Sequence, residues 1–390
     1  MRKLPTWVEV DLDRLVRNLD RIRARVGEGV KVLLTVKADA YGHGAVQVAQ
    51  AARGHADMLG VATLDEAIEL KEAGVERGIL ILSPILETQV PAVAGGGFAV
   101  TSSELAFAVK LSEFGVAHSV SVDVHVEVDT GMGRTGVAYE DAREEIARMS
   151  ELPGLRLAGA YTHFPVSDTD PDFTRRQIAL FEELLDDLRG DGVEVPLAHA
   201  ANSAALAGIP ESHMGMVRPG LLAYGLHPAG EAAALGVEPV MSWKSRVVRV
   251  RRVSAGKRIS YGRDFVTKRA SLIGVIPVGY GHGFPYRAGG GGAVLVGGRR
   301  APIVGRVTMD MTMVDLTDLP QAPAPGDEVV LVGAQGDEDI TFHDLAEWAG
   351  SICYEVMCGI SKRVPRTYFR EGRVETYKSL LGILPNHVAV

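Results

Sequence analysis

Up to about residue 235, short apolar runs alternate with segments whose apolar residues recur at helical spacing. Eight of these runs have the length of buried strands: VLLTV from 32, MLGVA from 58, GILIL from 78, FAVT from 98, SVDVHVEV from 121, LRLAGAY from 155, VPLAHA from 195 and MGMVR from 214. Between two of them, residues 63–74 predict a helix with Thr63 as N-cap, Glu66 completing a capping box and Gly74 as terminator. Eight strands that alternate with helices predict a closed (β/α)8 barrel.

After Pro239 the pattern changes to short alternating strands separated by glycine and proline. The expected strands are RVVRVRRV (246–253), LIGVIPVGYG, AVLVGG, PIVGRV, MTMVDL and DEVVLVG, with a single helix over 342–350 and a flexible glycine loop at 289–292. We interpret the arginines of 246–253 as one solvent-facing strand face and not as phosphate ligands. The fold class is therefore α/β, with an N-terminal (β/α)8 TIM-like barrel over residues 11–236 and a C-terminal all-β domain over 237–390. Residues 1–10 are expected to form a strand that packs with the C-terminal domain.

Composition narrows the class of protein. The chain has 390 residues, an apolar fraction of 46% and a formal charge of −8, which is typical of a globular protein and disfavours nucleic acid as a partner. Its two cysteines cannot build a disulfide framework, and no apolar run is long enough to span a membrane. We expect a cytoplasmic protein with no membrane or nucleic-acid partner.

The stretch LLTVKADAYGHG (33–44) ends an apolar strand on Lys37. Most lysines at strand ends only reach solvent, but other polar residues also follow predicted strands. They are Arg134 after the fifth strand, His163 after the sixth, Asn202 and Ser203 after the seventh, and Arg218 and Gly220 after the eighth. In a barrel of this type the carboxyl ends of the strands surround the active site, so these residues are expected to gather there.

The last two of these loops suggest a phosphate site. Barrels commonly build one after strands seven and eight, where Ser203 offers a hydroxyl and Gly220 allows close approach of the backbone. A phosphate site near a lysine points to pyridoxal 5'-phosphate (PLP), whose aldehyde condenses with a lysine amine. That cofactor would explain why Lys37 ends a buried strand.

Nine segments, in order along nearly the whole chain, carry a resemblance to a known family. They are VKADAYGHG, VDTGMGRTG, YTHF, ANSAA, VRPGLLAYGLHP, SYGRDF, IPVGYGHGFP, GRVTMDMTMVDL and YEVMCGISKRVPR. With them the chain resembles the alanine racemases, which are fold-type III PLP enzymes. The resemblance implies interconversion of L-alanine and D-alanine by two bases, Lys37, which carries PLP, and Tyr261, with D-alanine supplied for peptidoglycan.

The resemblance also implies further roles at the site. Arg218 faces the pyridine nitrogen of PLP and is supported by His163, while Arg134 and the amide of Met309 meet the substrate carboxylate. The remaining assignments are Tyr41, Ser203, Gly220 and Tyr354 for the phosphate, Tyr280 and Asp310 for the entrance, and Asn202 and Glu127 as supporting residues. No metal is implied.

Two positions depart from the family pattern. Glu127 stands where many members have a carbamylated lysine beside the arginine that corresponds to Arg134, and we predict that its carboxylate orients Arg134 by a charge-assisted hydrogen bond. Its shorter reach is expected to need a water or a strand shift. Thr308 stands where a cysteine is common.

The resemblance implies a homodimer in which Tyr261, Tyr280 and Asp310 complete the partner's barrel. Three alternatives are a non-catalytic single-barrel PLP-binding protein, a PLP-dependent decarboxylase of basic amino acids, and a Schiff-base aldolase without cofactor. The β domain argues against the first, and the absence of an evident substrate-recognition cysteine motif argues against the second. The sequence leaves open whether serine or another small amino acid is also a substrate.

Overall fold

The computed structural model describes residues 4–227 and 235–385. The chain divides into two compact units, Arg14–Ala40 with Ala45–Pro239, and Met1–Asp13 with Tyr41–Gly44 and Val240–Val390. Each unit is described by itself. The domain limits expected from the sequence, 1–10, 11–236 and 237–390, stay a prediction.

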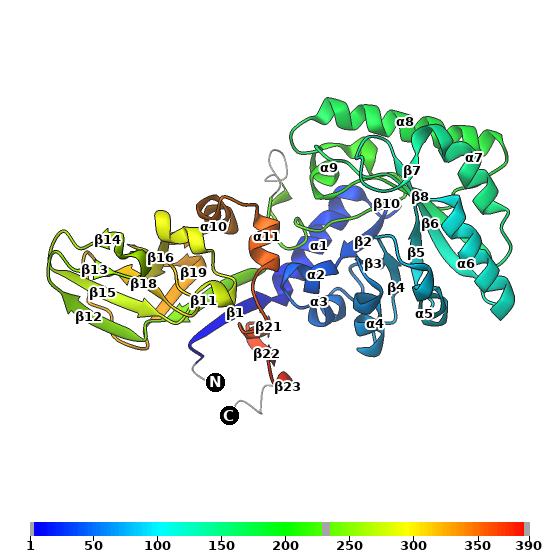
Figure 1. The fold of residues 1–390 in the computed structure, drawn as a ribbon. Helices are drawn as coiled ribbons and strands as arrows, with labels where there is room; N and C mark the ends of the chain where they lie inside the picture. Colours follow the sequence, from blue (N-terminus) through cyan, green and yellow to red (C-terminus); the bar gives the residue numbers. More distant parts are fainter. Residues whose placement is uncertain (1–3, 228–234, 386–390) are drawn as a thin grey trace. The chain divides into compact units, whose positions relative to one another are not determined.

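The first unit contains a closed parallel barrel (Figure 1). Its strands are β2 (Lys31–Thr35), β3 (Met58–Val61), β4 (Gly78–Ile81), β5 (Ala99–Ser102), β6 (Val122–Asp129), β8 (Leu155–Tyr161), β9 (Ala198–His199) and β10 (Met216–Val217). β5 pairs with both β4 and β6, and β10 pairs with both β9 and β2, so the ring has no free edge. The short β7 (Val137–Ala138) lies outside the ring against β6. The predicted eight-stranded barrel is confirmed.

Side chains fill the interior of this barrel. Leu33, Leu80, Ala99 and Met216, from four different strands, form one buried cluster. A Cβ added at Gly60 on β3 would lie 2.4 Å from a methyl group of Leu33, so a larger residue there would have to displace that side chain. The interior is therefore a packed core, and functional groups are left to the ends of the strands.

Helices cover the outside of the barrel (Figure 1). They are α1 (Leu12–Val26), α3 (Ala45–Ala51), α4 (Leu64–Glu72), α5 (Val90–Gly96), α6 (Leu105–His118), α7 (Tyr139–Ser150), α8 (Pro171–Gly190) and α9 (Ser203–Gly208). The capping box predicted for α4 is confirmed: Thr63 accepts from the amide of Glu66, and Glu66 accepts from that of Thr63, both at 3.2 Å. Gly74 follows the C-cap with φ of 76°, a left-handed conformation that glycine adopts without strain.

The second unit is built mainly from strands. One sheet has the order β17-β16-β19-β11-β1-β21-β22-β23, with β20 paired to β19, a second has the order β12-β15-β18, and β13 and β14 form a pair. The bounds are β1 (Thr6–Asp11), β11 (Met241–Arg246), β12 (Arg249–Val253), β13 (Arg258–Ile259), β14 (Phe265–Val266), β15 (Ser271–Ile276), β16 (Ala293–Val296), β17 (Arg299–Pro302), β18 (Thr312–Asp315), β19 (Glu328–Gln335), β20 (Glu338–Ile340), β21 (Arg366–Arg370), β22 (Arg373–Ser379) and β23 (Gly382–Pro385). β1 pairs antiparallel with β11 and parallel with β21, so this N-terminal strand lies between C-terminal strands.

The strand predicted over 246–253 is wrong as a single element. β11 ends at Arg246, which pairs with β19, and β12 begins at Arg249, which pairs with β15. The chain thus changes sheets at residues 247–248, a step that periodicity does not reveal. β12 is the edge strand of its sheet, and exposed arginines on an edge oppose pairing with another chain.

Two other local predictions also need correction, whereas one helix is confirmed. The strand expected at 302–307 lies earlier, as β17, and residues 289–292, expected to be a loop, overlap a 3-10 helix, η6 (Tyr286–Gly290). The helix expected over 342–350 is α10 (Phe342–Ala349), followed by α11 (Cys353–Cys358).

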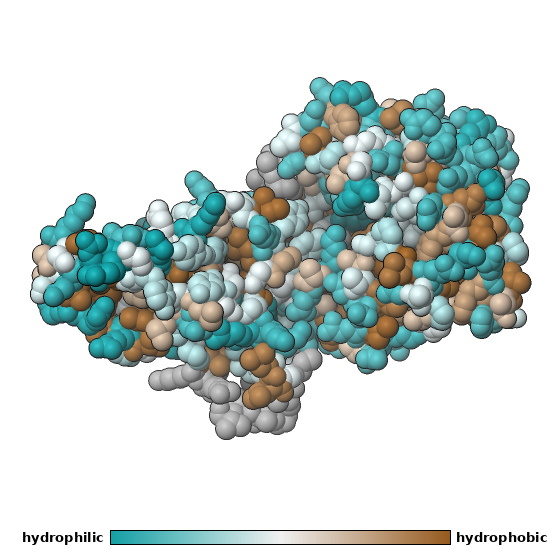
Figure 2. All heavy atoms as spheres, viewed as in Figure 1, coloured by the Kyte–Doolittle hydropathy of each residue, from teal (hydrophilic) through white to brown (hydrophobic). Residues whose placement is uncertain are grey.

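No helix within residues 4–227 and 235–385 is long and apolar enough to cross a membrane. The face of the molecule seen in Figure 2 mixes hydrophilic residues with scattered hydrophobic ones.

Candidate active site

The polar residues expected at the barrel mouth all follow the carboxyl ends of barrel strands. Lys37 follows β2, Arg134 follows β6, His163 follows β8, Asn202 and Ser203 follow β9, and Arg218 and Gly220 follow β10. Burial, reinforced by the charges of Arg218, Arg134 and Lys37, lowers the pKa of His163 to about 3. Arg218 contacts His163 directly, with Nη2 3.3 Å from Nδ1, and Arg134 and Lys37 follow strand ends at the same end of the barrel.

Lys37 begins a left-handed turn. Residues 38–41 have φ between 52° and 54°, although none of them is glycine. This conformation costs about 1–2 kcal/mol per residue, and consecutive non-glycine residues seldom adopt it. The amide of Ala40 donates to the carbonyl of Val36 at 2.8 Å. The sequence did not predict this turn, because the only nearby residues that favour positive φ are Gly42 and Gly44, which follow it.

Arg218 is buried and firmly held. Its Nη1 donates to Nδ1 of His199 at 2.8 Å, and its Nη2 donates to the carbonyls of Thr162 and Ala200 at 2.9 and 3.0 Å and to Nδ1 of His163 at 3.3 Å. Burial lowers the pKa of Arg218 to about 10, so the guanidinium keeps its charge at neutral pH. Among the described residues, its Nε–H has no hydrogen-bond acceptor, and this donor is available to a ligand.

Two buried histidines that sequence reasoning missed support Arg218. A guanidinium only donates, so Nδ1 of His199 must accept, and the proton of the neutral ring then lies on Nε2. That Nε2–H donates to Nδ1 of His125 at 2.9 Å. Burial lowers the pKa of both rings, that of His125 to about 4, and so keeps both imidazoles neutral at pH 7. The sequence does place both histidines within predicted barrel strands, now β6 and β9, and this position was the signal that could have identified them.

The loops after β9 and β10 meet at Ser203. Its hydroxyl oxygen accepts from the amides of Gly220 at 3.0 Å and Leu222 at 3.3 Å, which leaves the hydroxyl hydrogen to donate to an anion. The Gly220 amide, expected to bind phosphate, thus donates to Ser203 here. Asn202 caps α9 by accepting from the amide of Ala205 at 3.1 Å, a structural duty.

Glu127 lies buried beside Arg134, with side chains 3% and 52% exposed. Their closest atoms are 3.7 Å apart, which is ion-pair distance and too long for a direct hydrogen bond, as the shorter reach of glutamate led us to expect. The carboxylate accepts instead from the hydroxyl of Thr135 at 2.7 Å. The short glutamate side chain, fixed in β6, accounts for the longer separation.

The second unit presents the other predicted residues. Tyr261 lies on η4 (Tyr261–Arg263) and is 71% exposed. Tyr280 begins η5 (Tyr280–His282), and its amide donates to the carbonyl of Thr308 at 3.1 Å. Asp310 pairs with Arg363 at 2.8 Å. The side chains of Tyr261 and Tyr280 are both exposed in the single chain.

Further contacts order the same unit. The amide of Gly281 donates to the carbonyl of Met309 at 2.9 Å, whereas the amide of Met309 makes no hydrogen bond among the described residues. Thr308 bonds to the carbonyl of Met311 through its hydroxyl at 2.8 Å. The rings of Tyr41 and Tyr354 lie 5.8 Å apart, and burial, followed by the effects of Tyr354 and Cys358, raises the pKa of Tyr41.

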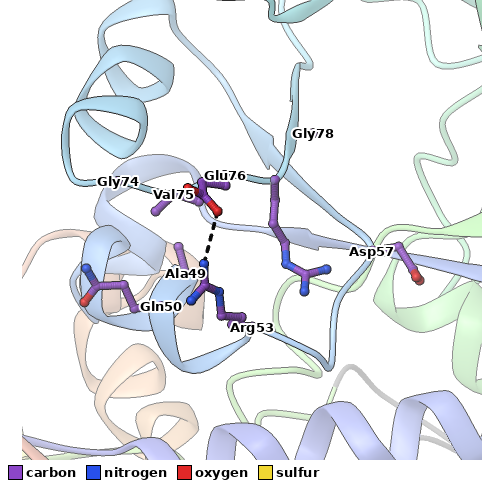
Figure 3. A pocket seen from close by; sticks show the side chains of 9 residues that line it. Ala49, Gln50, Arg53, Asp57, Gly74, Val75, Glu76 and Gly78 are labelled. Atoms are coloured by element: carbon purple, nitrogen blue, oxygen red, sulfur yellow. Dashed lines mark hydrogen bonds and ion pairs between the residues drawn. The ribbon is translucent and has the colours of Figure 1, made fainter.

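A cavity of about 560 Å³ lies away from these residues (Figure 3). It is lined by Asp57, which precedes β3, and by Arg77 and Gly78 at the start of β4, so it lies at the amino ends of the strands. Two of its charged side chains, Arg53 and Glu76, are exposed and pair with each other at 3.4 Å. Lys37, His163 and Arg218 follow the carboxyl ends of their strands, at the opposite end of the barrel.

Two protein-family models match most of the chain. The model of the alanine racemase N-terminal domain matches residues 10–228, and that of the alanine racemase C-terminal domain matches residues 240–368. The chain belongs to the alanine racemase family. The family predicted from the nine motifs is confirmed, and with it the enzyme class, an isomerase.

Relatives from several bacteria cover nearly the full chain. The alanine racemase of Halothermothrix orenii is 40% identical over 93% of this chain and 97% of its own length. Alanine racemase 2 of Caldanaerobacter subterraneus subsp. tengcongensis is 40% identical over 97% of this chain and 98% of its own length.

Solved alanine racemases have the same fold. The enzyme of Clostridium difficile 630 superposes with a TM-score of 0.91 at 33% identity, covering 96% of this chain and 98% of its own. The enzyme of Bacillus anthracis, solved with bound L-Ala-P, has a TM-score of 0.89 at 35% identity and covers 99% of both chains.

Proposed function

We propose that this alanine racemase family member uses PLP, with Lys37 and Tyr261 as the two bases, to interconvert L-alanine and D-alanine. The observation that carries the proposal is the held Arg218, whose Nε–H is left to donate, at the same barrel end as Lys37. D-Alanine for peptidoglycan is the product we expect the cell to use, and the cytoplasm is the expected location.

The donor set fits PLP. The hydroxyl of Ser203 suits the phosphate, the Nε–H of Arg218 suits the pyridine nitrogen, and the amine of Lys37 suits the aldehyde. Tyr41 and Tyr354 are proposed as further phosphate ligands, and Gly220, whose amide donates to Ser203, is proposed to let the phosphate approach the backbone closely. When bound, PLP withdraws electrons from the amino acid and so acidifies its α-proton.

Racemisation needs a proton to leave one face of the α-carbon and another to arrive on the opposite face. Lys37 serves one face through its ε-amine, and the phenol of Tyr261 serves the other. The hydrogen-bond acceptors of Arg218 include two histidine rings that are neutral at pH 7. The guanidinium can donate a hydrogen bond to the pyridine nitrogen, but it keeps its proton and does not transfer it. We infer that this limits electron withdrawal and suppresses transamination.

Arg134 and the amide of Met309 are proposed to hold the substrate carboxylate, with Tyr280 and Asp310 at the entrance. The unpaired Met309 amide supports its part in this proposal. The relatives were solved with bound L-Ala-P and with cycloserine, which supports an amino-acid ligand of similar size for this chain. His163 and Asn202 are proposed as supporting residues.

Glu127→Gln tests how Arg134 is oriented. The amide keeps an acceptor for Thr135 but removes the charge that faces Arg134, so we expect the KM for alanine to rise about fivefold to tenfold while kcat changes less. Steady-state kinetics with and without bicarbonate measure this. Thr135→Val is the matched control, because it removes the hydroxyl and keeps the ion pair. A wild-type KM in Glu127→Gln, or activity that depends on bicarbonate, would contradict the proposed role.

We propose a homodimer in which the bases of each site come from different subunits; the exposure of Tyr261 and Tyr280 supports this. Mixing inactive Lys37→Ala and Tyr261→Ala subunits should restore about one quarter of wild-type activity, because half of randomly paired dimers would hold one intact site of two. Activity is measured after denaturation and joint refolding. Inactive heterodimers, verified by mass spectrometry, would reject site sharing.

A chiral assay of the purified protein with PLP and a panel of L-amino acids tests the proposed function. We expect D-alanine as the main product and an absorbance band at about 420 nm from covalently bound PLP. Carbon dioxide release from ornithine or lysine would instead indicate a decarboxylase. Racemisation without the band would reject the cofactor.

A further inference from the structure

The carboxylate of Glu66 joins two segments of the chain. Its Oε2 accepts from the amides of Ala62 at 2.7 Å and Thr63 at 3.2 Å, which is the expected capping role at the start of α4. Its Oε1 accepts from the amide of Ala38 at 2.7 Å, a bond that capping does not require. One side chain therefore caps α4 and binds the first residue of the left-handed turn.

That turn needs such a bond. Residues 38–41 lie in a conformation that L-amino acids avoid, and such backbone persists only where its surroundings over-determine it. Glu66 holds the amide at its start, and the carboxylate of Asp39 accepts from the amide of Ala45 at 2.8 Å. Loss of the first bond would leave the residue next to Lys37 free to return to a right-handed or extended conformation.

The geometry also fixes Glu66 itself. β2 and β3 are parallel neighbours, and the amide of Val36 donates to the carbonyl of Gly60 at 2.8 Å just before the two strands diverge. α4 starts three residues after β3, so Glu66 reaches across to the end of β2 from a rigid support. Lys37 lies between Val36 and Ala38, both of which are bonded to the β3–α4 segment.

We propose that Glu66 is a positioning residue for Lys37: by holding the Ala38 amide, it fixes the direction in which the lysine side chain leaves the backbone. The inference rests on the proposed role of Lys37 as the PLP lysine. The failure of this inference can be told apart from the failure of that role, because the state of the turn is measured without cofactor and the PLP adduct is located separately.

The experiment compares Glu66→Gln and Glu66→Ala with two controls. A glutamine offers one acceptor oxygen and so cannot serve both Ala38 and the α4 amides, while alanine serves neither. Thr63→Ala removes the hydroxyl that caps the same helix but leaves Glu66 in place. Asp344→Ala removes the matching capping-box carboxylate of α10, in the other unit.

Two readouts separate positioning from plain stability. The first is hydrogen–deuterium exchange, by mass spectrometry without PLP, of peptides covering residues 38–45. The second is the dissociation constant of PLP, with borohydride trapping to locate the adduct. For both Glu66 variants we expect exchange about 10- to 100-fold faster and PLP binding weaker by a similar factor, as for loss of a hydrogen bond to a charged group. Both controls should lower Tm alone.

The outcomes are distinct. Exchange and PLP affinity in the Glu66 variants equal to those of Thr63→Ala would overturn the inference. If borohydride traps no PLP on Lys37 of the wild-type protein, the proposed function fails, and the positioning role fails with it, whatever the exchange shows. If Glu66→Ala does not fold, Glu66→Gln carries the comparison.

Discussion

Lys37→Ala is expected to lower the racemisation rate by at least about 10⁴-fold, the largest effect of any single change. The change removes both the amine that binds PLP covalently and one of the two bases, and no other described lysine follows a barrel strand at the mouth. Racemisation is measured by chiral chromatography, and the loss of the PLP absorbance band at about 420 nm is followed in the same sample.

Lys31→Ala is the matched control for this prediction. Lys31 is an exposed lysine at the amino end of the same strand, β2, and so at the opposite end of the barrel. We expect it to keep wild-type activity and the PLP band. Racemisation by Lys37→Ala at more than about a tenth of the wild-type rate would show that another group carries the chemistry.

Tyr261→Phe is expected to reduce kcat by about 10²–10⁴-fold, as for loss of a general acid–base group. The ring and its packing remain, so the effect isolates the phenol oxygen. Because Lys37 still serves one face, the α-proton of one alanine enantiomer should continue to exchange with solvent deuterium while that of the other does not. Proton NMR of L-alanine and D-alanine incubated separately in deuterated buffer measures both rates.

Tyr139→Phe serves as the control for the loss of a phenol oxygen. Tyr139 begins α7 on the barrel, and its hydroxyl donates to Glu183 at 3.2 Å. This variant should racemise at the wild-type rate. Equal slowing of α-proton exchange for both enantiomers in Tyr261→Phe would argue against a second base at that position.

Much of the barrel could be predicted because local physics specified it. The apolar runs that became the eight barrel strands are long enough for buried strands, and Thr63 with Glu66 caps a helix through bonds that span only three residues. Once the strands are placed, parallel topology brings their carboxyl ends together, so Lys37, His163 and Arg218 could be expected to gather before any distance was known.

Other features depend on partners distant in sequence. The chain changes sheets between Arg246 and Arg249 because one pairs with β19 and the other with β15, and an alternating pattern is the same in either sheet. Glu127 meets Arg134 at ion-pair distance because β6 fixes its backbone, a separation that residue type alone does not set.

The sequence by itself determined the eight-stranded barrel, the family and the residue types at the mouth, since each follows from apolar periodicity, local capping or ordered motifs. Only the tertiary structure decided how those groups are held. The left-handed turn after Lys37, the bond of Ala38 to Glu66 and the tautomers of His199 and His125 arise from contacts between segments that lie apart in the chain. Strain and proton position depend on which neighbour accepts each hydrogen bond, and folding alone supplies that neighbour.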